Sequence, residues 1–183
     1  MFTFVLLKTK IPMYTKPLFL TAFGWAVSAS LFAQNMYTMQ SINHHAPVQC
    51  SKSITINANA EKVWSVITDI NHWAGWQNDI SHATLHGSVT PGTAFDWRTG
   101  GASIHSVLHT VEPFRFFGWT GKTMGIQAIH NWTFTEAGGQ TTVTVEESMQ
   151  GLLAGLLKKS FNKSLEKGMV QWLNLLKAEC EKF

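Results

Sequence analysis

Two titratable side chains stand in apolar stretches that alternate like strands. His130 alternates with Trp132, and Glu147 alternates with Val145. Because side chains two residues apart on a strand share a face, we expect both to point inward, where they are costly unless paired. If they meet, Glu147 can orient or charge His130, as general acid–base catalysis requires. The alternative is a buried pair that fixes strand register or polarises one end of a ligand pocket.

The same alternation predicts the walls around this pair. Trp97 shares a face with Phe95, Ser106 shares one with Leu108, and Trp119 is expected from a neighbouring strand. An aromatic lining with few polar groups is the usual form of a small-molecule site. The predicted ligand-binding residues are therefore Trp97, Ser106, Trp119, His130, Trp132 and Glu147, and the catalytic candidates are His130 and Glu147.

Other constellations do not support a metal or cofactor site. His82 with His86, and His105 with His109, are four residues apart, which on a strand is about 13 Å and too far for one ion. The scattered glycines form no phosphate-binding loop, and Ser106 lacks the context of an activated nucleophile. We expect neither a metal nor a cofactor.

The composition indicates one well-packed domain. The chain has 183 residues, of which 45% are hydrophobic and 14% charged, a balance opposite to that of disordered chains. Three of the fourteen basic residues, Lys8, Lys10 and Lys16, precede Ala33, and none of the eleven acidic residues does. The remaining chain is near neutral, which argues against a nucleic-acid partner.

Residues 1–33 are interpreted as an export signal. Lys16 is followed by an apolar run from residue 17 to 27 and then by small residues, the order of a cleavable leader. We favour cleavage before Gln34, with a second context ending at Ala29, and Met13 is an alternative start. The predicted location is periplasmic or secreted, with no stable membrane span after cleavage. A membrane anchor is the alternative, although the run is short against the ~20 residues of a spanning helix.

The remaining chain divides into a flexible lead-in over residues 34–47 and a folded domain over residues 48–183. Cys50 and Cys180 form no metal signature. We treat them as free thiols, and whether they pair stays open because export would permit a disulfide. The oligomeric state is not indicated.

Hydrophobic periodicity predicts an α+β domain. A strand over residues 53–58 precedes a helix capped by Asn59 and a second short helical turn at Trp73. About seven strands joined by tight turns form an antiparallel sheet, with later strands expected over residues 94–99, 103–112, 115–120, 126–136 and 141–149. A long amphipathic helix follows from Leu153 to Cys180, roughly 45 Å long. It needs a long partner surface, which the concave face of a twisted sheet supplies around an apolar cavity.

This order of elements resembles the helix-grip fold. The residues resemble the polyketide cyclase/dehydrase-like branch of the START-like (SRPBCC) superfamily over about residues 53–181. The resemblance is carried by residues 60–64, 68–70, 73, 76, 91–97, 118–121, 130–134 and 142–151. The resemblance is specific for the fold but not for a function, because the superfamily includes lipid carriers, cyclases and hydrolases.

The sequence is compatible with three functions. The first is binding of a lipid-like, aromatic or polyketide-like molecule in the internal cavity. The second is a cyclase or dehydratase that uses His130 and Glu147 as its acid–base pair. The third is a cavity-less protein that acts through surface contacts.

Overall fold

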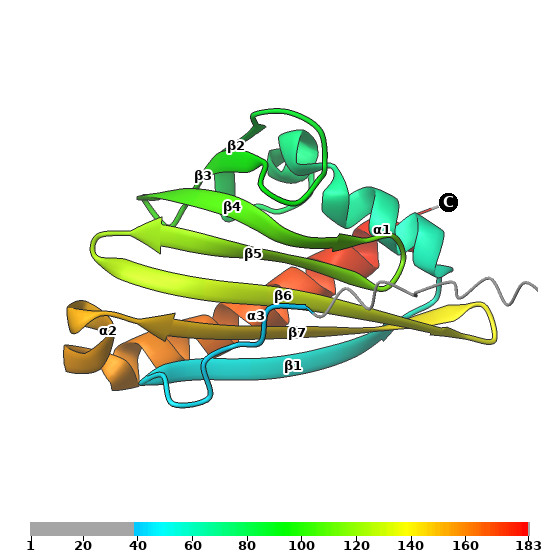
Figure 1. Ribbon diagram of the computed structural model, residues 1–183. Coiled ribbons are helices and arrows are strands. Elements are labelled where there is room, and N and C mark those ends of the chain that lie inside the picture. Colours follow the sequence, from blue (N-terminus) through cyan, green and yellow to red (C-terminus); the bar gives the residue numbers. More distant parts are fainter. Residues whose placement is uncertain (1–38, 183) are drawn as a thin grey trace, which may run out of the picture. The chain divides into compact units, whose positions relative to one another are not determined.

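The computed structural model describes residues 39–182, which form one antiparallel sheet with helices on one face (Figure 1). The strand order is β1-β7-β6-β5-β4-β3-β2. The strands are β1 (Val48–Ile56), β2 (Ile80–Leu85), β3 (Ala94–Thr99), β4 (Ala102–Glu112), β5 (Phe116–Thr123), β6 (Ile126–Ala137) and β7 (Gln140–Gln150). The helices are α1 (Ala60–Thr68), the 3₁₀ helix η1 (Ile70–Gly75), α2 (Leu152–Leu156) and α3 (Lys158–Cys180). The predicted α+β helix-grip architecture with seven strands is confirmed.

The connection between β1 and β2 supplies two short helices, as predicted. The Asn59 side chain accepts a hydrogen bond from the backbone amide of Lys62 and so caps α1, while Val63 and Ile67 bury its apolar face. Helix η1 follows at once and places Trp73 in the core, where its indole nitrogen donates to the carbonyl of Ile67 at 2.9 Å. This bond ties the two helices together and fixes the direction of the Trp73 ring.

The C-terminal helix is shorter than predicted, because its first turns form a separate helix. Helix α3 covers 23 residues, or roughly 35 Å, and its buried stripe includes Leu165, Met169 and Trp172. The chain bends at Leu157, and α2 packs against the ends of β6 and β7 with Ala154 fully buried. A straight continuation would carry these residues away from that contact.

The described part of the predicted lead-in is anchored to the sheet. The backbone amide of Asn43 donates to Ser148 on β7, and the Asn131 side chain on β6 donates to the carbonyl of Gln40. Ile42 is buried. Residues 39–47 therefore lie against the face of the sheet opposite to α3. The predicted export signal of residues 1–33 lies outside the described residues.

The two cysteines and the hydropathy of the helices were both subjects of prediction. Cys50 and Cys180 are free thiols, and burial raises the pKa of the Cys180 thiol to about 12. Within residues 39–182, no helix combines the length and the hydropathy needed to cross a bilayer.

The junction between β7 and α2 should be sensitive to substitution of Gly151. A Cβ atom there would lie 2.3 Å from the carbonyl oxygen of Gly125, and Gly151 has a φ of 131°. We expect Gly151→Ala to lower the free energy of unfolding by about 2–4 kcal/mol, measured by urea denaturation. Gly155→Ala is the matched control, since a Cβ there meets nothing within 4 Å and should stabilise α2 by about 0.5–1 kcal/mol. Equal effects of the two variants would contradict this account of the junction.

Candidate functional site

His130 and Glu147 meet in the space between the sheet and α3. They lie directly opposite each other in the β6–β7 register, so both side chains point to the face that α3 covers. The Nδ1 atom of His130 and the Oε2 atom of Glu147 are 2.5 Å apart, and each residue is 8% exposed. The carboxylate thus accepts the Nδ1–H and leaves Nε2 as the free position of the imidazole.

The opposite side of the His130 ring is fixed by Trp119. This residue faces His130 in the β5–β6 register, and the two rings are parallel within 9° with centroids 4.3 Å apart. Imidazole and indole therefore form a stack that holds the ring plane. His130 is constrained by Glu147 through its nitrogen and by Trp119 through its face.

Two polar atoms in this region have no partner. The Nε2 atom of His130 and the Nε1 atom of Trp132 are both buried and form no hydrogen bond with any described residue. Their rings are neighbours on β6, with centroids 5.5 Å apart. A buried polar atom without a partner costs about 1–3 kcal/mol, so a pair of them in an apolar interior calls for an explanation.

Trp97 and Ser106 form a second polar contact on the same face. The indole Nε1 of Trp97 donates to the Ser106 hydroxyl oxygen at 3.0 Å, and Ser106 is buried. The hydroxyl therefore positions the Trp97 ring. All six residues predicted to line the site lie on this face, and the structure joins them into a His130–Glu147 pair, a Trp97–Ser106 pair and the neighbouring rings of Trp119 and Trp132.

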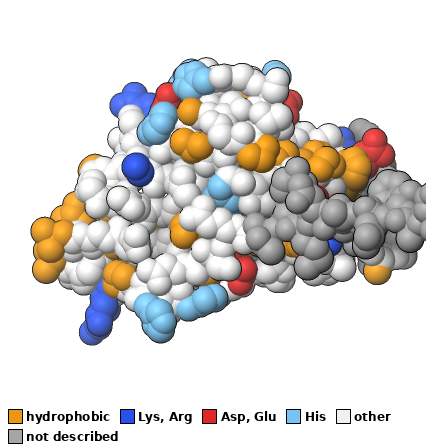
Figure 2. Space-filling model, viewed as in Figure 1, with side chains coloured by type: hydrophobic (Ala, Val, Ile, Leu, Met, Phe, Trp, Pro, Cys, Tyr) orange, Lys and Arg blue, Asp and Glu red, His pale blue; other side chains and the backbone are white. Residues whose placement is uncertain are grey.

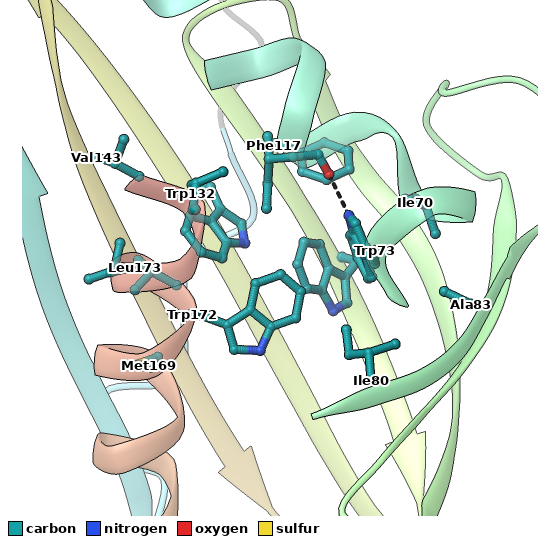
Figure 3. Packing of buried hydrophobic residues seen from close by; sticks show 14 of the residues in the cluster. Ile70, Trp73, Ile80, Ala83, Phe117, Trp132, Val143, Met169, Trp172 and Leu173 are labelled. Carbon is teal, nitrogen blue, oxygen red and sulfur yellow. Dashed lines mark hydrogen bonds between the residues drawn. The ribbon is translucent and has the colours of Figure 1, made fainter. Parts of the chain in front are cut away.

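Aromatic rings occupy the centre of the predicted cavity. Trp73 from η1 lies between Phe95, Trp119 and Trp172, with ring centroids 5.2–5.7 Å away, as Figure 3 shows for Trp73 and Trp172. Three hollows of about 430, 330 and 310 Å³ lie elsewhere, and none of the three is lined by His130 or Glu147. Aromatic rings from the described residues thus pack against one another where the sequence suggested open volume. The inward reach of Trp73 and Trp172, from two different helices, accounts for the difference.

The opposite face of the sheet carries buried polar residues that the sequence did not reveal. The strand register shifts between Leu108 and Thr110, and the His109 ring covers Gly118, where an added Cβ would lie 2.5 Å from it. Burial, reinforced by the nearby charge of His130, lowers the pKa of His109 to about 4. Alternation assigns His109 to this face, but it cannot show that the ring is covered there, because the cover depends on how the chain folds over the sheet.

The surface histidines His86 and His105 share one carboxylate, although they belong to different pairs in the sequence. Asp96 on β3 accepts from His86 at 2.7 Å and lies 2.8 Å from His105 on β4, and these hydrogen bonds lower the pKa of the Asp96 carboxyl. The pairing crosses strands and joins one histidine from each of the two sequence pairs. Within residues 39–182, no group of three His, Cys, Asp or Glu side chains is arranged to hold a metal ion.

Comparison with known proteins identifies relatives at the level of family and fold. The family model described as polyketide cyclase/dehydrase and lipid transport matches residues 47–181. Among curated proteins, none matches the chain significantly.

Three similar solved structures illustrate the shared fold. A hypothetical protein from Helicobacter pylori has a TM-score of 0.69 at 18% identity, and the match covers 80% of this chain and 99% of that one. The Zhui aromatase/cyclase from Streptomyces sp. R1128 has a TM-score of 0.65 at 14% identity, covering 73% and 93%. A START superfamily protein from Mycobacterium smegmatis has a TM-score of 0.61 at 13% identity, covering 73% and 97%. At these identities the likeness concerns the fold.

Removing one partner of the buried pair should destabilise the domain. We expect Glu147→Ala to lower the free energy of unfolding by about 2–4 kcal/mol, because it leaves the Nδ1–H of His130 buried and unpaired. The double variant His130→Phe with Glu147→Leu should cost less than this single change. Glu146→Ala, next along β7 but on the other face, is the control and should have little effect. A double variant that loses as much stability as Glu147→Ala, or more, would contradict the pairing.

His109 should make stability depend on pH. Its pKa is about 4 in the folded protein against an ordinary value of 6.5, so the unfolded chain takes up the proton first. The stabilisation is therefore complete above pH 6.5 and is lost as the pH falls toward 4. After allowance for solvent screening, the loss should be about 1–2 kcal/mol. When the free energy of unfolding is measured by denaturation at several pH values over this range, it should vary less with pH in His109→Gln. In the exposed His45→Gln the dependence on pH should be unchanged.

Proposed function

The chain belongs to the polyketide cyclase/dehydrase and lipid-transport family, and from this membership we propose that it binds a hydrophobic small molecule between the sheet and α3. The observation that carries the proposal is the pair of buried, unpartnered atoms, Nε2 of His130 and Nε1 of Trp132, in an aromatic interior. A ligand that supplies a polar group at this point would relieve their cost. The rest of its surface would contact aromatic rings.

The two atoms define what the ligand must present. Trp132 Nε1 can only donate a hydrogen bond, whereas His130 Nε2 can accept one or, when the ring is protonated, donate one. A hydroxyl oxygen satisfies both atoms at once, because it accepts from Trp132 and donates to His130. A carbonyl oxygen satisfies Trp132 and the protonated His130. The proposed ligand class is therefore a lipid-like, aromatic or polyketide-like molecule with an oxygen in an otherwise apolar body.

Binding requires that aromatic side chains move, and Trp172 is the best placed to do so. Trp73 and Trp97 are each held by a hydrogen bond from the indole nitrogen, but none holds the indole of Trp172 to any described residue. Gly168 lies one turn earlier on α3, and a Cβ added there would meet no atom within 4 Å. We therefore propose that rotation of Trp172 toward this free space admits the ligand.

The second candidate function is catalysis of a cyclisation or dehydration. It is favoured by one observation, that Glu147 holds Nδ1 of His130 while Nε2 stays unengaged. In this arrangement Nε2 could take a proton from the bound molecule, and the carboxylate would stabilise the imidazolium that forms. The proton would return to a departing hydroxyl in a dehydration, which leaves the site unchanged.

Ligand binding is tested by native mass spectrometry and solvent extraction of the purified protein, followed by titration with the recovered molecule. We expect Trp132→Phe, which keeps a ring but removes the Nε1–H, to raise the dissociation constant about 5–10-fold. Trp64→Phe should leave it unchanged, because Trp64 packs against Phe114, Phe117 and Phe134 instead. A folded protein that retains no molecule and takes up none from a lipid extract would refute the proposal and favour the interaction protein.

The same variants separate binding from catalysis. If the protein is an enzyme, His130→Ala and Glu147→Gln should abolish turnover of the recovered molecule, while the dissociation constant rises no more than it does in Trp132→Phe. Parallel loss of binding and turnover would instead assign the pair an orienting role.

The proposed place of action is the exported compartment, because residues 1–33 have the order of a leader. Intact-mass analysis of the protein from its native host tests this. An intact mass that corresponds to a chain starting at Gln34 would support export with cleavage. A mass that still includes residues 1–33 would contradict the proposed cleavage.

A further inference from the structure

One end of the molecule carries a concentration of exposed apolar side chains. They belong to α2, to the residue that follows it, and to the turn between β5 and β6. We call this group the leucine tip: Leu152, Leu153, Leu156, Leu157 and Met124. Leu152 is 77% exposed, Leu156 70% and Met124 67%. Figure 1 places α2 and the β5–β6 turn at the same end of the sheet, and Figure 2 shows an apolar patch there.

The two parts of the leucine tip are held together. The backbone of Gly151 approaches that of Gly125 so closely that no Cβ would fit between them. Helix α2 buries Ala154 against the sheet, which leaves its leucines facing outward. The two other large exposed apolar residues among the described ones, Phe114 and Val170, lie apart from this group in sequence. A clustered exposed patch, unlike single exposed residues, indicates an interaction surface.

The charged residues that neighbour the leucine tip in sequence are all positive. Four lysines lie close to it in sequence, and all four are exposed: Lys122, Lys158, Lys159 and Lys163. Neither residues 113–135 nor residues 148–165, which carry the tip, contain an aspartate or glutamate. The near-neutral domain therefore carries local positive charge on the two chain segments that form its apolar end, and we call these four lysines the lysine collar.

We propose that the leucine tip docks on the surface of a bilayer that contains anionic lipids. Leucines entering the boundary of the acyl chains, with lysines at the level of the headgroups, are the arrangement of an interfacial membrane contact. A second copy of this chain fits less well, because a two-fold contact through the tip would bring two lysine collars together. This inference goes beyond ligand binding and does not depend on it.

The test places an environment-sensitive dye on Leu156→Cys in the full chain with Cys50→Ser, since Cys180 is buried. The control carries the dye on Thr135→Cys, exposed near the far end of β6. Phosphatidylcholine vesicles with about 30% phosphatidylglycerol should shift the tip dye to shorter wavelength and leave the control dye unchanged. Because both proteins have the same N-terminal residues, the difference reports the tip.

Substitutions then separate the apolar and charged contributions, using the dye titration with vesicles. Lys159→Ala should weaken binding about fivefold, and Lys62→Ala, on α1, should not. Leu152→Gln should weaken it about tenfold, whereas Val170→Gln should have little effect. No shift at the tip, or equal shifts at both dye positions, would overturn the proposal. So would a concentration-dependent shift without vesicles, which would identify a second copy as the occupant.

Discussion

The structure depends on one constraint, that α1, η1 and α3 together must cover the inner face of a seven-stranded sheet. Antiparallel register assigns every second residue of each strand to that face, so the partners of a buried polar residue are chosen by register. His130 meets Glu147 and Trp119 for this reason, since the three are opposite one another on adjacent strands. The chemistry of the candidate site thus follows from the pairing of β5, β6 and β7.

The interior combines tight aromatic packing, which stabilises the fold, with buried polar atoms, which destabilise it. Helix α3 and η1 fill the inner space with Trp172 and Trp73, which contact each other at 5.2 Å between ring centroids and contribute apolar burial. The same filling leaves His130 Nε2 and Trp132 Nε1 without partners. An interior optimised for stability alone would have apolar atoms at these positions. Their retention is the physical reason for favouring a ligand over a purely structural core.

The sequence predicted the elements and the inward residues because both depend on short-range periodicity. The alternation around His130 and Glu147 assigned their faces correctly, and periodicity with turn signals supplied the order of strands and helices on which the family resemblance was based. Periodicity could not predict how far Trp73 and Trp172 reach into the space between elements, so the predicted open volume differs from the filled core. Nor could it predict that the His109 side chain is covered on the other face, or that the chain bends at Leu157, close to where Ala154 packs against the sheet.

The leucine tip and the candidate site lie along the same strands. Strand β6 begins at Ile126, next to the tip, and reaches His130 four residues later, while α3 leaves the tip at Lys158 and reaches Gly168 after ten residues. The free space beside Gly168 is therefore on the helix that starts at the tip. If the tip faces a bilayer and Trp172 moves as proposed, a hydrophobic molecule would travel a short path between acyl chains and aromatic rings. The exposed leucines and the unpartnered polar atoms, each unfavourable in isolation, would then serve one process.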